Sequence, residues 1–158
     1  MENYLLHTDF TWAYQIKYPA DWQKLAISPT LFGFFSPAES PNDIFQDHVR
    51  VSIDETIVSL REYIDFEISK LPSVAPTLQI GGRSALTVAN LPAEQFEMSG
   101  QIGPAFRNGK PDMMPIRTLN VCVMKGKLVY TLTYIAEARA YEKFMPQFRV
   151  MLESFELG

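Results

Sequence analysis

Two largely apolar segments of nine residues flank the turn Lys125-Gly126-Lys127 in the C-terminal half of the chain. The runs, 116–124 and 128–136, contain many β-branched and aromatic side chains, which favour extended backbone. Two such runs joined by a short glycine-containing turn are typical of a β-hairpin. The sequence therefore predicts an antiparallel sheet with this hairpin as its most clearly marked part.

Other segments alternate with a period of two, which is the spacing of one face of a strand. A strand is predicted over 10–18, with every second side chain buried: Phe10, Trp12, Tyr14, Ile16 and Tyr18. The same alternation predicts strands over 48–54 and 92–98. Further strands are predicted over 23–27 and 30–35, after the turn at Pro19, and a hairpin of 78–80 with 84–89 is predicted to turn at 81–83. The stretch 99–115 is rich in glycine and proline and is predicted to be a long loop, either functional or mobile.

Two regions carry the three-to-four spacing of amphipathic helices. Residues 59–71 begin with Ser59 and Glu62, a capping box, and Pro72 is expected to end the helix. The C-terminal region from 141 is also helical, and Pro146 predicts the start of a second helix that runs to about 154. The order of elements lacks regular βαβ units, so we expect one α+β domain over 1–158, a central antiparallel sheet with helices on both faces.

Charge and cysteine content limit the classes of partner and compartment. The net charge of −4 and the scattered basic residues argue against a nucleic-acid partner. Cys122 is the single cysteine, so no internal disulfide can form. No run is long and apolar enough to span a bilayer, and the first residues do not read as a signal peptide. A soluble protein is expected: cytoplasmic as the sequence stands, or in the thylakoid lumen or periplasm if a targeting segment was removed.

Motifs for catalysis are absent from the sequence. It has no Gly-x-Ser-x-Gly motif and no phosphate-binding loop, and Cys122 lies in the middle of a predicted strand, where burial is the default. We therefore predict no catalytic residue and a chain that is not an enzyme. A small enzyme with a pocket under 99–115 remains the alternative.

Two segments supply weaker candidate sites. Glu39, Asp43, Asp47 and His48 could converge on a metal ion, although their spacing does not match a calcium loop and a solvated loop of turn-forming residues is the simpler interpretation. The predicted loop 99–115 contributes candidates for protein binding, namely Arg107, Asn108, Lys110 and Asp112.

Several of these segments together resemble the PsbP-like family, the extrinsic subunits of photosystem II and their bacterial relatives. The resemblance covers nearly the whole chain and is clearest in its C-terminal block. The residues that carry it are Phe10, Ile16, Tyr18-Pro19 and Trp22, then Phe34-Phe35-Ser36-Pro37, then Ser59-Leu60 with Glu62-Tyr63, then 129–137, 141–146 and 151–156.

The resemblance implies an α-β-α sandwich and a non-enzymatic role in binding a larger assembly. It makes an accessory or assembly factor of photosystem II the leading expectation, with another protein or a membrane-protein complex as partner. Some family members retain calcium or manganese, so either ion is implied by resemblance alone. The same fold also serves a nuclear-transport regulator that binds a small GTPase and domains of bacterial signalling proteins. A cytosolic adaptor or sensor domain is therefore the second hypothesis.

Overall fold

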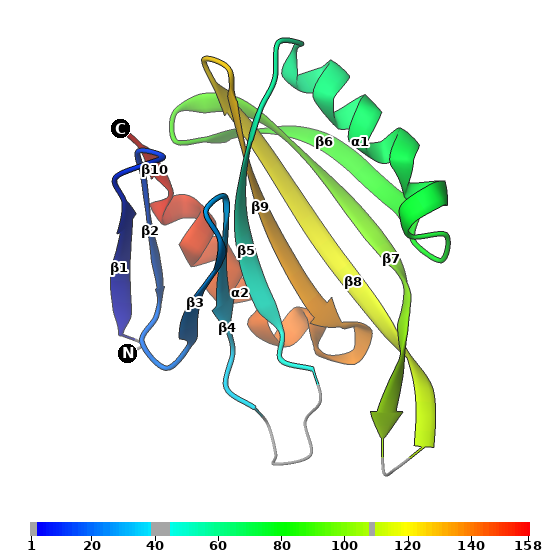
Figure 1. Ribbon diagram of the computed structural model, residues 1–158. Coiled ribbons are helices and arrows are strands. Elements are labelled where there is room, and N and C mark those ends of the chain that lie inside the picture. Colours follow the sequence, from blue (N-terminus) through cyan, green and yellow to red (C-terminus); the bar gives the residue numbers. More distant parts are fainter. Residues whose placement is uncertain (1–2, 39–44, 108–109) are drawn as a thin grey trace.

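The computed structural model describes residues 3–38, 45–107 and 110–158 (Figure 1). Strands make up most of that part, and two helices accompany them. In chain order the elements are β1 (Tyr4–Asp9), β2 (Tyr14–Pro19), β3 (Gln23–Ser28), β4 (Leu31–Phe35), β5 (His48–Glu55), α1 (Leu60–Val74), β6 (Gln79–Val88), β7 (Leu91–Arg107), β8 (Lys110–Lys125), β9 (Leu128–Glu137), a short 3₁₀ turn (Ala138–Ala140), α2 (Tyr141–Ser154) and β10 (Glu156–Leu157).

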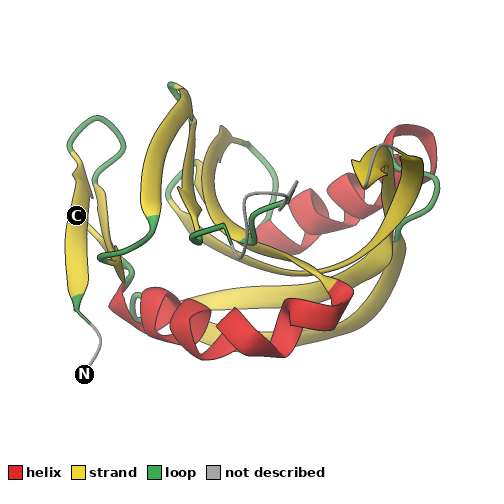
Figure 2. Ribbon diagram, turned by 90° about the horizontal axis from the view of Figure 1, so that it is seen from below, coloured by secondary structure: helices red, strands yellow, loops and turns green. Residues whose placement is uncertain are grey.

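The strands form two antiparallel sheets. The large sheet has seven strands in the order β3-β4-β5-β9-β8-β7-β6, and the small one has the order β1-β2-β10. Figure 2 shows that the large sheet is strongly curved rather than flat. The predicted α+β class and the central antiparallel sheet are therefore confirmed.

Each helix packs on its own set of strand residues. In β8, Val121 and Val123 belong to the main core, which α2 closes with Phe148 and Met151. Cys122, between those two valines, belongs instead to a smaller cluster with Ile64 of α1. Successive side chains of a strand point to opposite faces, which explains this alternation. We call the side of the large sheet that carries Cys122 the α1 side.

The best-marked local predictions are confirmed. The turn Lys125-Gly126-Lys127 joins β8 to β9, and Gly126 has φ of +61°, which glycine adopts without strain. Ser59 caps α1: its Oγ accepts the backbone N–H of Glu62 at 3.2 Å and donates to Glu62 Oε1 at 3.1 Å.

The predicted strand over 10–18 is wrong in its first half. The chain turns after Asp9, whose Oδ1 accepts the backbone N–H of Trp12 at 2.9 Å. Ala13 closes the turn at φ of 54°, and β2 starts only at Tyr14. Phe10 is therefore 92% exposed instead of buried, whereas Tyr14, Ile16 and Tyr18 are in the core as predicted.

The hairpin predicted to turn at 81–83 is also wrong. Residues 79–88 form the continuous strand β6, whose register shifts between Ile80 and Arg83. The turn lies later, at Ala89 and Asn90, which have φ of 52° and 62°. A Gly-Gly pair occurs in β-bulges as well as in turns. The turn predicted from these glycines is therefore several residues away from the observed one.

The described part of the predicted loop 99–115 is strand instead. It extends β7 and β8 into a two-stranded ribbon whose register shifts between Ile102 and Ala105, where Gly103 has φ of 136°. Pairing of β8 with β9 begins at Ile116, so residues 110–115 of β8 pair with β7 alone. Proline is tolerated on such an edge because its missing N–H breaks no ladder, which accounts for Pro111 and Pro115.

Both helices run through their prolines. α1 continues past Pro72 to Val74, and α2 is one helix from Tyr141 to Ser154 with Pro146 inside it. Two separate C-terminal helices were predicted, and that prediction is wrong. A proline removes one backbone hydrogen bond, and the burial of Phe148 and Met151 on the main core outweighs that loss.

Candidate functional site

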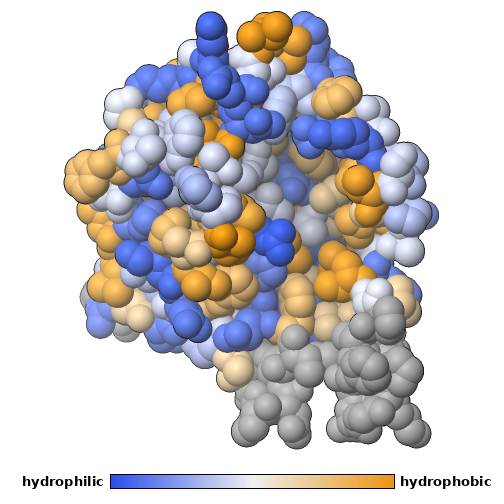
Figure 3. Space-filling view, viewed as in Figure 1, coloured by the Kyte–Doolittle hydropathy of each residue, from blue (hydrophilic) through white to orange (hydrophobic). Residues whose placement is uncertain are grey.

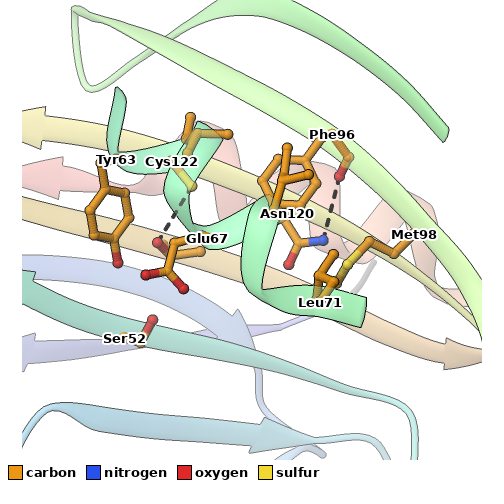
Figure 4. A pocket seen from close by; sticks show the side chains of 11 residues that line it. Ser52, Tyr63, Glu67, Leu71, Phe96, Met98, Asn120 and Cys122 are labelled. Atoms are coloured by element: carbon orange, nitrogen blue, oxygen red, sulfur yellow. Dashed lines mark hydrogen bonds between the residues drawn. The ribbon is translucent and has the colours of Figure 1, made fainter. Parts of the chain in front are cut away.

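A cavity of about 180 Å³ lies between α1 and strands of the large sheet (Figure 4). Tyr63, Glu67 and Leu71 line it from α1, because residues four apart share one helix face. Asn120 and Cys122 line it from β8, because alternate residues share one strand face. Further lining comes from Ser52 on β5, Thr131 on β9, Phe96 and Met98 on β7, and Ile64 and Ile68 on α1.

Asn120 organises the polar floor of the cavity. Its Nδ2 donates to Thr118 Oγ1 at 2.9 Å and to the carbonyl oxygen of Phe96 at 3.4 Å. Its Oδ1 accepts the hydroxyl of Thr133 at 3.1 Å. These partners use the donors and acceptors of a side chain that is only 5% exposed. The Asn120 amide therefore links β8 to β7 and β9 and has a structural role rather than a ligand-binding one.

The thiol and the phenol at the cavity stay neutral at physiological pH. Burial raises the pKa of the Cys122 thiol to about 11, and the thiol contacts Thr131 Oγ1 at 3.5 Å. Burial also raises the pKa of Tyr63, whose hydroxyl donates to Asp54 Oδ2 at 3.0 Å. A neutral thiol is a poor nucleophile and a poor metal ligand. The cavity is also smaller than the roughly 300–1,000 Å³ of common ligand pockets.

Structural hydrogen bonds hold Asp47 and His48, two of the predicted metal ligands. Asp47 Oδ1 accepts the backbone N–H of Glu137 at 3.0 Å, and its carboxylate is buried. His48 contacts the carbonyl oxygen of Gln46 through Nδ1 and accepts the N–H of Arg50 Nε at Nε2, both at 3.0 Å. Burial lowers the pKa of His48 to about 4, so its ring is neutral and both of its nitrogens are engaged.

The other two predicted ligands, Glu39 and Asp43, lie outside the described residues. Within the described ranges, no group of three or more His, Cys, Asp or Glu side chains is placed to hold a metal ion. The metal site and the calcium or manganese that the resemblance implies stay predictions.

Three of the four predicted protein-binding residues lie near the end of the β7–β8 ribbon. Arg107 is the last residue of β7 and pairs with Lys110, the first of β8, while Asp112 pairs with Ala105. Asn108 lies outside the described residues. The ribbon therefore brings the described three to one end of the molecule, and their role in binding stays a prediction.

Sequence reasoning missed the part of the α1 side that α1 leaves open, over β3, β4 and β5. Leu25 and Ile27 point to this side and are 48% and 46% exposed. Arg50 points there from β5 and is also exposed. Figure 3 shows hydrophobic residues gathered over β3 and β4 on this face. Strands were predicted over 23–27, which follows a turn, and over 48–54, which alternates, but neither pattern could tell which face another element would cover.

Arg50 carries an unneutralised positive charge on this open area. Its Nε–H donates to the neutral ring of His48, and no carboxylate of the described residues forms an ion pair with it. Burial, with no acidic neighbour to oppose it, lowers the pKa of the guanidinium. The terminal nitrogens of Arg50 are therefore suited to an anion that the described part of the chain does not supply.

In the part of the chain that the structure describes, neither helix has the length and apolar character needed to cross a bilayer.

No family model matches the sequence, and no curated protein matches it either. Solved structures do match in fold. Cyanobacterial PsbP (CyanoP) from Synechocystis is similar at a TM-score of 0.68 and 13% identity, over 100% of this chain and 94% of that one. LpqN of Mycobacterium tuberculosis, described as involved in cell envelope biogenesis, has a TM-score of 0.65 and 20% identity over 99% and 90%.

The Ran-binding protein Mog1p of Saccharomyces cerevisiae is similar at a TM-score of 0.63 and 13% identity, over 99% of this chain and 96% of that one. At these identities the likeness concerns the fold. The chain therefore has the PsbP-like fold that the sequence resemblance implied, the fold that cyanobacterial PsbP and Mog1p share.

Proposed function

We propose that this chain is a non-enzymatic protein-binding module and that its partner docks on the open part of the α1 side, over β3, β4 and β5. Proteins of the same fold support a binding role, since yeast Mog1p is a Ran-binding protein. Exposed apolar side chains beside an unpaired cation are typical of a protein-binding surface.

The charge of Arg50 is the observation that carries the proposal. The hydrogen bond from Nε to His48 fixes the guanidinium, and within the described residues no carboxylate forms an ion pair with its terminal nitrogens. A partner carboxylate could accept two parallel hydrogen bonds there, and such charge-assisted bonds contribute roughly 1.5–3 kcal/mol. Leu25 and Ile27, two strands away on the same side, would bury apolar surface of the same partner.

The proposal has two narrower forms. In one, the chain is an accessory or assembly factor of photosystem II in the thylakoid lumen or periplasm, which the fold of cyanobacterial PsbP supports. In the other, it is a cytosolic adaptor or sensor domain, which the fold of Mog1p supports. Both forms include an α-β-α sandwich, in which the helices flank both faces of the large sheet. This layering is supported by the separate clusters to which Val121 and Cys122, neighbours in β8, belong.

A non-enzymatic role is supported by the state of the titratable groups. The Cys122 thiol is neutral and buried, and both ring nitrogens of His48 are engaged. General acid–base catalysis needs a group with a pKa near the working pH, and neither of these meets that condition.

Capture from an extract of the source cells tests the proposal. The purified chain is immobilised as wild type, as Arg50→Gln and as Arg61→Gln, and the bound proteins are quantified by mass spectrometry. Arg61 is an exposed arginine of α1, so its variant removes the same charge elsewhere. We expect wild type and Arg61→Gln to retain a common partner that Arg50→Gln loses by at least about tenfold, the effect of 1.4 kcal/mol.

Equal capture by all three proteins would contradict the proposal. The identity of the partner decides between the narrower forms, because a photosystem component supports the first and a soluble regulatory protein supports the second.

A further inference from the structure

Strand β3 forms one edge of the large sheet. It is the first strand in the order and pairs with β4 alone among the described strands. All six of its residues, Gln23–Ser28, are exposed. An edge strand presents a row of unpaired backbone N–H and C=O groups, which can pair with another extended chain.

The opposite edge, β6, is protected in ways that β3 is not. Its register shifts between Ile80 and Arg83, and this irregularity interrupts the row of backbone hydrogen bonds that an added strand would need. Arg83 also forms ion pairs with Asp65 at 2.6 Å and Glu94 at 3.2 Å. A bulge inside an edge strand is a usual means of blocking strand addition, and its position distinguishes β6 from β3, since both edges carry a basic side chain. In β3 the register shift comes only at its end, between Ala26 and Ser28.

The side chains of β3 determine which residue types of an added strand would pack against this edge. Leu25 and Ile27 point to the α1 side, and half of their surface is exposed. Lys24 points to the other side, where its Nζ lies 6.0 Å from the ring centroid of Phe32. Lys24 forms no ion pair within the described residues. The edge therefore favours apolar side chains on one face and an acidic side chain on the other.

We propose that β3 accepts an extended segment of a partner protein as an eighth strand of the large sheet. The segment alternates apolar residues, which pack on Leu25 and Ile27, with acidic residues, which pair with Lys24. This mode of binding obtains affinity from main-chain hydrogen bonds and specificity from alternate side chains. The inference rests on the proposed protein-binding function and names the chemistry of the partner at that surface.

A second copy of this chain is the weaker occupant. Pairing two β3 strands would join only six residues from each copy. That contact is much smaller than the roughly 1,200–2,000 Å² of surface that a stable interface buries. A peptide segment, in contrast, can continue its contacts beyond the edge onto the α1 side.

An eight-residue peptide of alternating valine and glutamate is the probe. Amide hydrogen exchange of the ¹⁵N-labelled chain is measured by NMR with and without this peptide. Two control peptides are measured in the same way: one has the same composition with the valines and the glutamates in two separate blocks, and the other alternates valine and lysine. We expect the Val-Glu peptide alone to slow exchange of alternate β3 amides. Lys24→Glu should weaken its binding by at least about tenfold, a change of 1.4 kcal/mol, and favour the Val-Lys peptide. Lys127→Glu, in the exposed β8–β9 turn, is the matched control and should bind like wild type.

Unchanged exchange in β3, protection of another edge instead, or binding that Lys24→Glu does not alter would each overturn the inference. Protection of β3 that rises with protein concentration and needs no peptide would assign the edge to a second copy and also overturn it. Failure here is distinct from failure of the proposed function. If partner capture depends on Arg50 but β3 is not protected, strand addition alone is wrong. If β3 is protected but capture does not depend on Arg50, the proposed Arg50 surface is wrong.

Discussion

The Nε–H of Arg50 donates a 3.0 Å hydrogen bond to Nε2 of His48, so a permanent cation rests on a neutral imidazole. The same ring stacks on Phe35, with centroids 4.7 Å apart and planes at 24°. Its Nδ1 lies 3.0 Å from the carbonyl oxygen of Gln46, which fixes the proton on Nδ1. Protonation of Nε2 would remove the acceptor and place two cations in contact.

Acid should therefore destabilise the fold through His48. The folded pKa of about 4 lies below the ordinary value of 6.5, so between these values the unfolded chain binds a proton that the folded chain does not. The free energy of unfolding should fall as the pH drops from 6.5 toward 4, by up to about 1.4 kcal/mol per pH unit. Urea denaturation at several pH values measures this slope.

His48→Gln is the comparison, because glutamine keeps a donor and an acceptor but does not titrate. Its slope between pH 6.5 and 4 should be shallower than that of wild type. Some slope should remain, since burial also lowers the pKa of His7. Equal slopes in the two proteins would show that His48 is not the group that titrates.

Removal of the Asn120 amide should destabilise the fold strongly. Asn120→Ala leaves the Thr133 hydroxyl and Thr118 Oγ1 without their partner, whereas the Phe96 carbonyl oxygen still lies in the backbone ladder of an inner strand. Each buried polar group left unpaired costs roughly 1–3 kcal/mol. Ser84→Ala is the control, because its bond to Gln95 is exposed and should change the unfolding free energy by less than about 0.5 kcal/mol. A loss equal to that of the control would show that water replaces the Asn120 network.

The Cys122 thiol should react slowly while the protein is folded. It is 3% exposed, and burial holds its pKa at about 11, so the thiolate is scarce at pH 8. The reaction with an aromatic disulfide reagent can be followed by absorbance in buffer and in guanidinium chloride. We expect labelling in buffer to be at least about a hundredfold slower than in denaturant. Comparable rates would indicate that the cavity beneath α1 opens readily.

Local chemistry made part of the fold predictable. The Ser59–Glu62 cap and the turn at Gly126 each involve a few neighbouring residues, and both occur as expected. Gly81-Gly82 and Ala89-Asn90 show the limit of this reasoning. A glycine pair suits a turn or a bulge equally, whereas the turn here uses two residues without the usual glycine signal. Only the pairing of β6 with β7 decides between the two places.

The candidate surface was less predictable than the fold. Arg50 and Leu25 lie in strands that were predicted, yet the exposure of these two residues depends on how much of the sheet α1 covers. That coverage follows from long-range packing of Ile64 against Phe96 and Cys122, which no local pattern encodes. The opposite error occurred at 99–115, where glycine and proline suggested a loop although a neighbouring strand keeps the segment extended.

Two glycines of adjacent strands should respond in opposite ways to alanine. A Cβ on Gly100 in β7 would collide with the backbone carbonyl oxygen of Thr77, in the segment that leaves α1, and would come within 2.9 Å of Leu78 Cδ2. That segment is tied down, since Thr77 Oγ1 donates to the carbonyl oxygen of Gln101 at 2.6 Å. Gly100→Ala should therefore lower the unfolding free energy by about 1–3 kcal/mol.

A Cβ on Gly82 in β6 would meet nothing within 4 Å, and its backbone does not require positive φ. Gly82→Ala should therefore raise the unfolding free energy by about 0.4–1 kcal/mol, because alanine restricts the unfolded chain more than glycine does. Urea denaturation of both variants beside wild type measures the two changes. A loss at Gly82 as large as at Gly100 would mean that the bulge of β6 needs glycine, and no loss at Gly100 would mean that the segment after α1 is free to move away from β7.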